Sequence, residues 1–222
     1  ISVNYNMGIA LKEQGKLYEA LNCYEKELSL NPRDPRPYNN SGIIFEEQGK
    51  FKEATISYKK ALTINPGYAA VHNNLGIVFR NQGKLEKALL AYDKSLSLDP
   101  NNANALNNKG SILLRLARPN EAIEYLNKSL AINPILVDTH FNMGVAFQDL
   151  GNLKDSIRSY EKAISIEPNH VKSIMNLSAV KSRSIPAWHL PMMNDTCRNT
   201  AYLNAIKLAI NEGDFVLEIG TG

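Results

Sequence analysis

Residues 69–102 read AAVHNNLGIVFRNQGKLEKALLAYDKSLSLDPNN, and this stretch decides the fold. Its first part, residues 70–81, has the apolar spacing of an amphipathic helix, and Gly83 follows as a left-handed cap. The second part, residues 85–98, predicts another helix, which ends before Pro100 because the residue preceding a proline avoids helical backbone. The stretch therefore predicts two helices joined by a short turn.

The same pattern recurs with a period of 34 residues and without insertions, which predicts five consecutive repeats at 1–34, 35–68, 69–102, 103–136 and 137–170. Three kinds of position recur in every repeat: a glycine in the first helix, an aromatic residue or leucine in the second, and a proline after it. The glycines are Gly8, Gly42, Gly76, Gly110 and Gly144. The second-helix residues are Tyr24, Tyr58, Tyr92, Leu126 and Tyr160, and the prolines are Pro32, Pro66, Pro100, Pro134 and Pro168. Residues 171–184 continue the pattern as a sixth first helix, which we expect to cap the stack.

Two expectations concern small residues. Each first helix has a glycine and each second helix an alanine, as in Gly76 and Ala88, and these small residues should let the two backbones approach. The closer packing would offset the free energy that a glycine costs inside a helix. In the fourth repeat Ala117 stands where the capping glycine should be, so we expect the turn between its helices to differ from the others.

These positions resemble the tetratricopeptide repeat: a small pair at the seventh and eighth places, an aromatic at the eleventh, alanine at the twentieth and proline at the thirty-second. The resemblance covers residues 1–170. It implies an all-α solenoid, a right-handed superhelix of helix-turn-helix repeats whose first helices line a concave groove. It also implies that a protein or peptide partner binds in this groove, whereas the oligomeric state stays open.

One position of the expected groove is uniformly asparagine. An amide side chain both donates and accepts hydrogen bonds, which suits it to a peptide backbone of any sequence. This asparagine column, and the asparagines that precede its middle members, are Asn6, Asn40, Asn74, Asn108, Asn142 and Asn176, with Asn39, Asn73 and Asn107. A ladder of this kind resembles the repeat domain of O-GlcNAc transferase, which implies capture of an extended segment. The alternative is that these amides only satisfy local backbone or water.

A second mode of groove binding requires a basic set that clamps two carboxylates. The first helices carry only scattered bases, Lys12, Arg36, Arg80 and Arg115. We therefore do not expect a carboxylate clamp.

After residue 184 the period stops. Residues 185–222 predict a linker, a helix from about Asp195 and a short apolar strand that runs into Gly220 and Gly222. The spacing of His189, Met192, Asp195, Arg198 and Tyr202 ahead of this strand, together with the strand itself, resembles the start of a protein arginine methyltransferase.

This second resemblance implies a Rossmann-like domain, truncated here, and S-adenosylmethionine as the cofactor of a longer protein. The positions implied at the cofactor are His189, Met192, Arg198, Glu218, Gly220 and Gly222. The acidic residue of the second strand and the paired glutamates of that family would lie beyond Gly222. We therefore expect the chain alone to bind the cofactor poorly and to transfer no methyl groups. The alternative is that residues 185–222 are only a linker and cap of a pure interaction scaffold.

The composition excludes few classes of function or partner. The net charge of +3 gives no reason to expect nucleic acid or a membrane surface as a partner, and no apolar run could span a bilayer. The two cysteines, Cys23 and Cys197, form no disulfide framework, which favours a reducing, cytoplasmic compartment. His72 and His140 occupy one repeat position, so we expect them to pack rather than bind metal.

Overall fold

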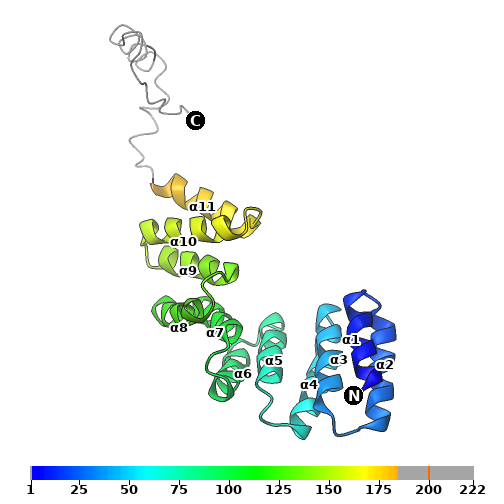
Figure 1. The fold of residues 1–222 in the computed structure, drawn as a ribbon. Coiled ribbons are helices and arrows are strands. Elements are labelled where there is room, and N and C mark those ends of the chain that lie inside the picture. The colour runs from blue at the N-terminus through cyan, green and yellow to red at the C-terminus, as the bar shows by residue number, and fades with distance from the viewer. Residues whose placement is uncertain (1, 185–199, 201–222) are drawn as a thin grey trace.

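The structure is a computed structural model that describes residues 2–184 and residue 200. Within these residues the chain forms eleven α-helices and no strand, and the helices follow one another along a curved stack (Figure 1). The helices are α1 (Val3–Glu13), α2 (Leu17–Leu30), α3 (Pro35–Glu47), α4 (Phe51–Ile64), α5 (Ala69–Asn81), α6 (Leu85–Leu98), α7 (Ala103–Arg115), α8 (Pro119–Ile132), α9 (Val137–Asp149), α10 (Leu153–Ile166) and α11 (Val171–Ser184).

The all-helical solenoid expected from the period is confirmed. The helices of residues 69–102 begin and end within one residue of the predicted bounds. The segment 185–222, apart from residue 200, lies outside the described residues, and with it the strand and the methyltransferase-like domain start expected there.

The first helices of the repeats lie on the inner side of the curve (Figure 1). Each of them contacts the first helix of the next repeat, from α1 with α3 to α9 with α11, whereas each second helix packs mainly against the two first helices beside it. Like helices approach one another on the shorter side of a curved stack. The concave face is therefore built by α1, α3, α5, α7, α9 and α11.

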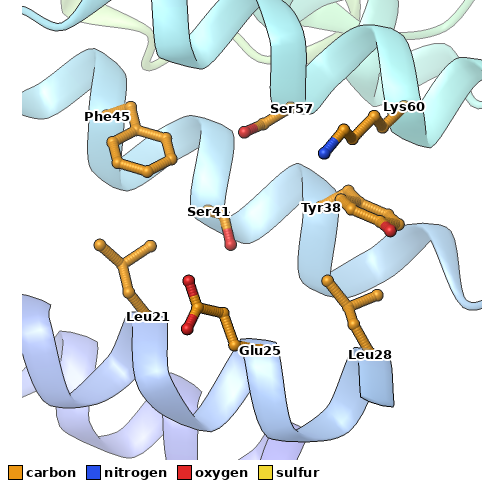
Figure 2. A pocket seen from close by; sticks show the side chains of 8 residues that line it. All are labelled: Leu21, Glu25, Leu28, Tyr38, Ser41, Phe45, Ser57 and Lys60. Carbon is orange, nitrogen blue, oxygen red and sulfur yellow. The ribbon is translucent and has the colours of Figure 1, made fainter. Parts of the chain in front are cut away.

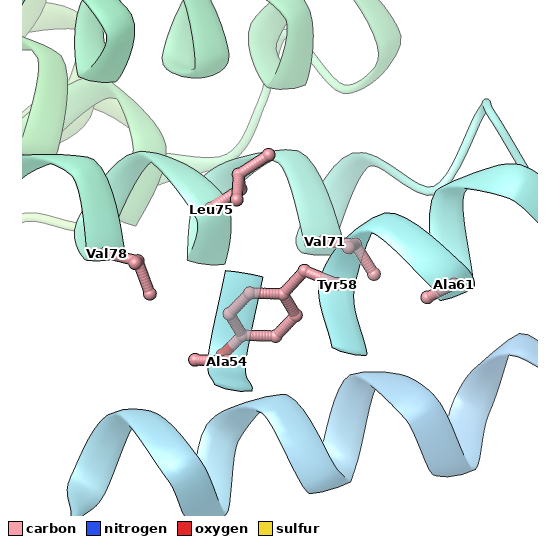
Figure 3. Close-up of a cluster of buried hydrophobic side chains, with 6 residues drawn as sticks. All are labelled: Ala54, Tyr58, Ala61, Val71, Leu75 and Val78. Atoms are coloured by element: carbon pink, nitrogen blue, oxygen red, sulfur yellow. The ribbon is translucent and has the colours of Figure 1, made fainter. Parts of the chain in front are cut away.

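The glycine of each first helix lies against the side chain of its own second helix. A methyl group added at Gly42 would overlap Cε1 of the Tyr58 ring. This ring is fully buried among residues of α4 and α5, including Ala54, Val71 and Val78 (Figure 3). The nearest neighbour of the glycine is thus a tyrosine ring in four repeats. In the fourth repeat Gly110 faces Leu126, and Ala122 O lies 3.5 Å from the added methyl group, which is the approach of backbones that the sequence predicts.

The turn in the fourth repeat does not differ from the others, contrary to our expectation. Ala117 adopts φ 56°, the left-handed conformation that Gly83 adopts at φ 74°. The hydrogen bonds are also equivalent: Arg118 N–H donates to Leu113 O at 2.9 Å, as Lys84 N–H donates to the carbonyl five residues before it. The flanking helices impose the turn, and the alanine bears the strain.

The first four junctions between repeats alternate between two kinds. At the start of α5 and α9 a histidine nitrogen binds the proline carbonyl of the preceding loop, His72 Nε2 with Pro66 O at 2.9 Å and His140 Nε2 with Pro134 O at 2.8 Å. One turn later Leu75 and Met143 are nearly buried against the preceding repeat. These two junctions are closed by apolar side chains, and both histidines pack as expected.

At the start of α3 and α7 the junction is polar instead. Asp34 accepts a hydrogen bond from Arg36 N–H at 2.9 Å, and Asn102 accepts one from Ala105 N–H at 3.0 Å, so a side chain caps each helix. Ser41 stands at the position that Leu75 occupies one repeat later.

Hollows lined by both polar and apolar residues lie at these two junctions. Figure 2 shows the first, of about 290 Å³, where Glu25 of α2 points toward Ser41 of α3. In the second, of about 360 Å³, Lys109 forms an ion pair with Asp93 and lies 3.8 Å from the centre of the Tyr125 ring. The first four junctions therefore recur over two repeats, whereas the fifth, between α10 and α11, has Leu177 at the position of Ser41 and Lys109.

The glycine–tyrosine contact predicts a difference between two substitutions of one kind. Gly42→Ala should lower the free energy of unfolding by roughly 1–3 kcal/mol, because the buried ring of Tyr58 has no room to move. Gly110→Ala faces the flexible end of Leu126, and the gain of up to about 1 kcal/mol in helix propensity should offset the crowding. Urea unfolding followed by circular dichroism measures both changes. Equal losses in the two variants would contradict this account.

The strained turn predicts that Ala117→Gly stabilises the chain by about 1 kcal/mol, since glycine adopts positive φ without a steric penalty. Gly83→Ala is the matched control and should destabilise by a similar amount. Both are compared with the native chain by thermal unfolding. No change in melting temperature on Ala117→Gly would mean that the turn carries no strain.

Candidate functional site

The asparagines of the concave face bind one another across the repeats. Asn74 Nδ2 donates to Asn39 Oδ1 at 3.1 Å, and Asn142 Nδ2 donates to Asn107 Oδ1 at 2.9 Å. The same bond joins Asn108 to Asn73 at 3.1 Å. Each of these bonds joins the first helices of neighbouring repeats.

Two bonds within helices link these pairs into a longer path. Asn39 Nδ2 donates to Asn40 Oδ1 at 3.2 Å, and Asn73 Nδ2 donates to Asn74 Oδ1 at 3.4 Å. The path therefore runs from Asn108 through Asn73, Asn74 and Asn39 to Asn40, and we call it the amide relay. Wherever it crosses from one repeat to the next, the donor points toward the N-terminal end of the stack.

The relay ends on two tyrosines. Asn40 Nδ2 donates to the hydroxyl groups of Tyr5 and Tyr24, at 3.3 and 3.4 Å. At the far end of the stack Asn176 Nδ2 donates to the hydroxyl of Tyr160 at 3.3 Å, outside the relay. Asn6 is exposed, and its side chain forms no hydrogen bond within the described part of the chain. Seven of the nine predicted asparagines are therefore bonded to another asparagine: the five of the amide relay, and Asn107 with Asn142.

The relay leaves part of each amide free. An asparagine side chain has two N–H donors and two acceptor positions on its oxygen. Asn39, Asn73 and Asn74 each use one donor and one acceptor within the relay. These amides bond to one another rather than to local backbone. Asn39 is buried, whereas the half-buried Asn73 and Asn74 keep a donor and an acceptor for a further partner.

The tyrosine hydroxyl groups reach the floor of the same face. Tyr58 donates to Glu46 Oε2 at 3.0 Å, and Tyr160 donates to Gln148 Oε1 at 3.1 Å. Both acceptors precede their tyrosine by twelve residues. Burial raises the pKa of Glu46, against the opposing effects of the Tyr58 hydrogen bond and the positive charge of Arg80.

Tyr92 has no such acceptor. Its hydroxyl is buried and has no hydrogen-bond partner among the described residues. The position that holds Glu46 or Gln148 in other repeats is occupied here by Arg80, which can only donate. Burial of the hydroxyl raises the pKa of Tyr92. A buried hydroxyl without a partner costs about 1–3 kcal/mol, so the arginine reduces stability at this point.

A polar hollow lies beside this arginine on the concave face. It has a volume of about 340 Å³ and is bounded by α5, α7, α9 and α11. Its lining residues are Arg80, Asn107, Asn108, Ser111, Asp138, Phe141, Asn142 and Lys172. We call it the Arg80 hollow. Sequence reasoning missed it, because it counted Arg80 among scattered bases and did not consider Lys172.

The other bases of the concave face differ from Arg80 in their partners. Lys12 forms an ion pair with Glu47 at 3.0 Å, and Arg36 binds Asp34 at 2.7 Å and lowers the pKa of that carboxyl group. Arg80 forms no ion pair with any residue of the described chain, and its Nε is 3.4 Å from Asn81 Oδ1. Lys172 likewise has no carboxylate partner among residues 2–184.

The cofactor positions expected from the tail, His189, Met192, Arg198, Glu218, Gly220 and Gly222, all lie outside the described residues. Among the residues that are described, no group of histidine, cysteine or acidic side chains could hold a metal ion. No helix of the described part is long and apolar enough to cross a membrane.

Comparison with protein families finds tetratricopeptide repeats along most of the described chain. A family described as tetratricopeptide repeat matches residues 69–102 and 137–170, the third and fifth repeats. A family described as TPR repeat matches residues 8–49 and 42–83. A further tetratricopeptide-repeat family matches residues 91–124.

Solved structures show the same fold. YrrB, described as a TPR protein with an unusual peptide-binding site, has a TM-score of 0.62 at 24% identity, over 78% of this chain and 89% of its own. TTC0263, a thermophilic TPR protein of Thermus thermophilus, has a TM-score of 0.64 at 20% identity, over 80% and 96%. The first TPR of Spaghetti (RPAP3), bound to the HSP90 peptide SRMEEVD, has a TM-score of 0.51 at 26% identity, over 52% and 91%.

One curated protein matches over a short stretch. The arginine N(omega)-methyltransferase of Streptomyces achromogenes subsp. streptozoticus is 46% identical to this chain over 43 residues. That stretch is 19% of this chain and spans 12% of the length of the methyltransferase.

The unequal environments of two tyrosines predict opposite effects of one substitution. Tyr58→Phe should lower the free energy of unfolding by about 1–3 kcal/mol, because it removes a hydrogen bond to a partly buried carboxylate. Tyr92→Phe removes a hydroxyl without a partner and should leave stability unchanged or raise it. Denaturant unfolding of both variants measures the difference. A loss on Tyr92→Phe as large as that on Tyr58→Phe would show that the hydroxyl of Tyr92 has a partner in solution.

Proposed function

Because the chain belongs to the tetratricopeptide-repeat proteins, we propose that its concave face binds an extended segment of a partner protein. One observation carries the proposal: the amide relay and the Asn107–Asn142 pair lie along this face, and their amides have hydrogen-bonding capacity left over. A peptide backbone presents donors and acceptors in alternation, and an amide that offers one of each can bind it irrespective of side chains.

The spacing of the helices supports an extended ligand. First helices packed about 8–10 Å apart place one amide pair for about every three residues of extended chain, each of which spans about 3.3 Å. The bonds between neighbouring repeats also hold the amides in position before a ligand arrives. A site ordered in advance loses less conformational entropy on binding.

Related folds favour the same proposal. YrrB is described as having a peptide-binding site, and the RPAP3 repeat was solved with a peptide of HSP90. These descriptions concern those proteins. For this chain they support a protein or peptide partner as the class of ligand.

A second proposal concerns a longer protein of which this chain would be the substrate-recruiting part. The short match to an arginine methyltransferase supports it, together with the spacing of His189, Met192 and Arg198 ahead of Glu218. In that protein the repeats would hold a substrate or partner beside a domain that uses S-adenosylmethionine. The alternative is an interaction scaffold without a catalytic domain.

The groove proposal predicts the effect of removing two amides. Peptides are selected on the native chain from a phage-displayed library of random dodecapeptides, labelled, and titrated by fluorescence anisotropy. Asn74→Ala combined with Asn108→Ala should raise the Kd roughly tenfold or more, since each lost hydrogen bond is worth about 1 kcal/mol.

The control changes two exposed asparagines of α8, Asn120→Ala and Asn127→Ala, and should leave the Kd unchanged. Circular dichroism checks that every variant keeps its helix content. An unchanged Kd in the Asn74 and Asn108 variant would place peptide binding on another surface.

A further inference from the structure

The Arg80 hollow combines departures from the repeat pattern that nothing in the fold requires. Arg80 replaces the acceptor that Tyr58 and Tyr160 find twelve residues before them, and it leaves the hydroxyl of Tyr92 without a partner among the described residues. Departures that reduce local stability are expected where a residue serves binding. The departure at Arg80 therefore points to a ligand.

A second departure lies in the same hollow. Ser111 occupies a repeat position that is a branched apolar residue elsewhere, Ile9, Ile43, Ile77 or Val145. The smaller side chain contributes to the opening of the hollow, and its hydroxyl forms no hydrogen bond within the described residues. The position of Ser111 is thus constant in kind in the other repeats, whereas the position of Arg80 varies and also holds Lys12, Glu46, Leu114 and Gln148. The two residues lie at one place in space, on α5 and α7.

The hollow has several donors without a partner among the described residues. Arg80 and Lys172 have no ion-pair partner in the described chain, and Asn108 and Asn142 each use only one of their two N–H groups. Tyr92 also has a hydroxyl without an acceptor, and the residue that would supply that acceptor, Arg80, lies on the wall of the hollow. A ligand that supplies acceptor oxygens would satisfy the donors of Arg80, Lys172, Asn108 and Asn142, whereas Tyr92 is fully buried and does not line the hollow.

The charge of the lining selects the kind of anion. Arg80 and Lys172 contribute two positive charges to the lining, and Asp138 contributes one negative charge. Oδ1 of Asp138 is 4.0 Å from Nε2 of His170. The excess of one positive charge matches a group with a single negative charge. A guanidinium group also binds a carboxylate through two parallel hydrogen bonds.

We propose that the Arg80 hollow binds an aspartate or glutamate side chain of the partner segment. This inference rests on the proposed function, because it adds side-chain selectivity to a groove that holds backbone. Asn108, at the start of the amide relay, borders the hollow, so a segment held by the relay would present a side chain to Arg80. Phe141, packed edge-on against His170, gives the hollow one apolar wall.

The test uses the dodecapeptide library on the native chain and on Arg80→Gln. This variant removes the charge and supplies Tyr92 with an acceptor of the kind that Gln148 gives Tyr160, so its melting temperature should be equal or higher. Acidic residues should be enriched at one position of the peptides selected on the native chain. That enrichment should disappear on Arg80→Gln and weaken on Lys172→Met, whereas Lys162→Met on the exposed face of α10 should retain it.

Three versions of one selected peptide then separate the possibilities. Replacing its glutamate by glutamine should raise the Kd roughly tenfold for the native chain and leave it unchanged for Arg80→Gln. Equal changes in both proteins would overturn the inference and leave the groove proposal standing. A phosphoserine peptide that binds more tightly than the glutamate peptide would overturn the assignment to carboxylates. If no peptide binds the native chain, the groove proposal itself fails.

Discussion

The tyrosine ring that lies against a glycine Cα sets the separation of the two helices in four of the five repeats. Because the glycine has no side chain, the ring lies flat against helix backbone and becomes fully buried. Burial of the ring fixes the place of its hydroxyl, which emerges at the floor of the concave face between the first helices. The contact that holds each repeat together thus also decides where the groove has its polar groups.

Each hydroxyl must then find a partner, and the concave face supplies it in different ways. Glu46 and Gln148 accept from their own tyrosines, whereas Asn40 donates to Tyr24 and thereby ends the amide relay. Arg80 supplies no acceptor, so the hydroxyl of Tyr92 has no hydrogen-bond partner in the described chain. The fold therefore tolerates a loss of local stability on the concave face, the face that we propose to bind a ligand.

The sequence was sufficient for the architecture and insufficient for the interactions on the concave face. Repeated glycines and prolines mark where helices begin and end, so the bounds of α5 and α6 could be predicted within a residue. The turn at Ala117 could not, because its conformation is imposed by the helices on either side. An asparagine can bind a peptide, the backbone or another asparagine, and only the positions of neighbouring repeats decide which. The Arg80 hollow needs residues from four helices, and no spacing along the chain brings Arg80 and Lys172 together.

Because apolar and polar junctions alternate along the first four junctions, neighbouring repeats of the solenoid are not interchangeable. If the third repeat were deleted, α4 would precede α7, and Lys59 would take the place from which Asp93 now pairs with Lys109. Two ammonium groups would then face each other at a junction built for an ion pair, although each repeat alone would still satisfy every position of the pattern. At this junction the loss of a single repeat therefore creates a mismatch that the repeat pattern alone does not reveal.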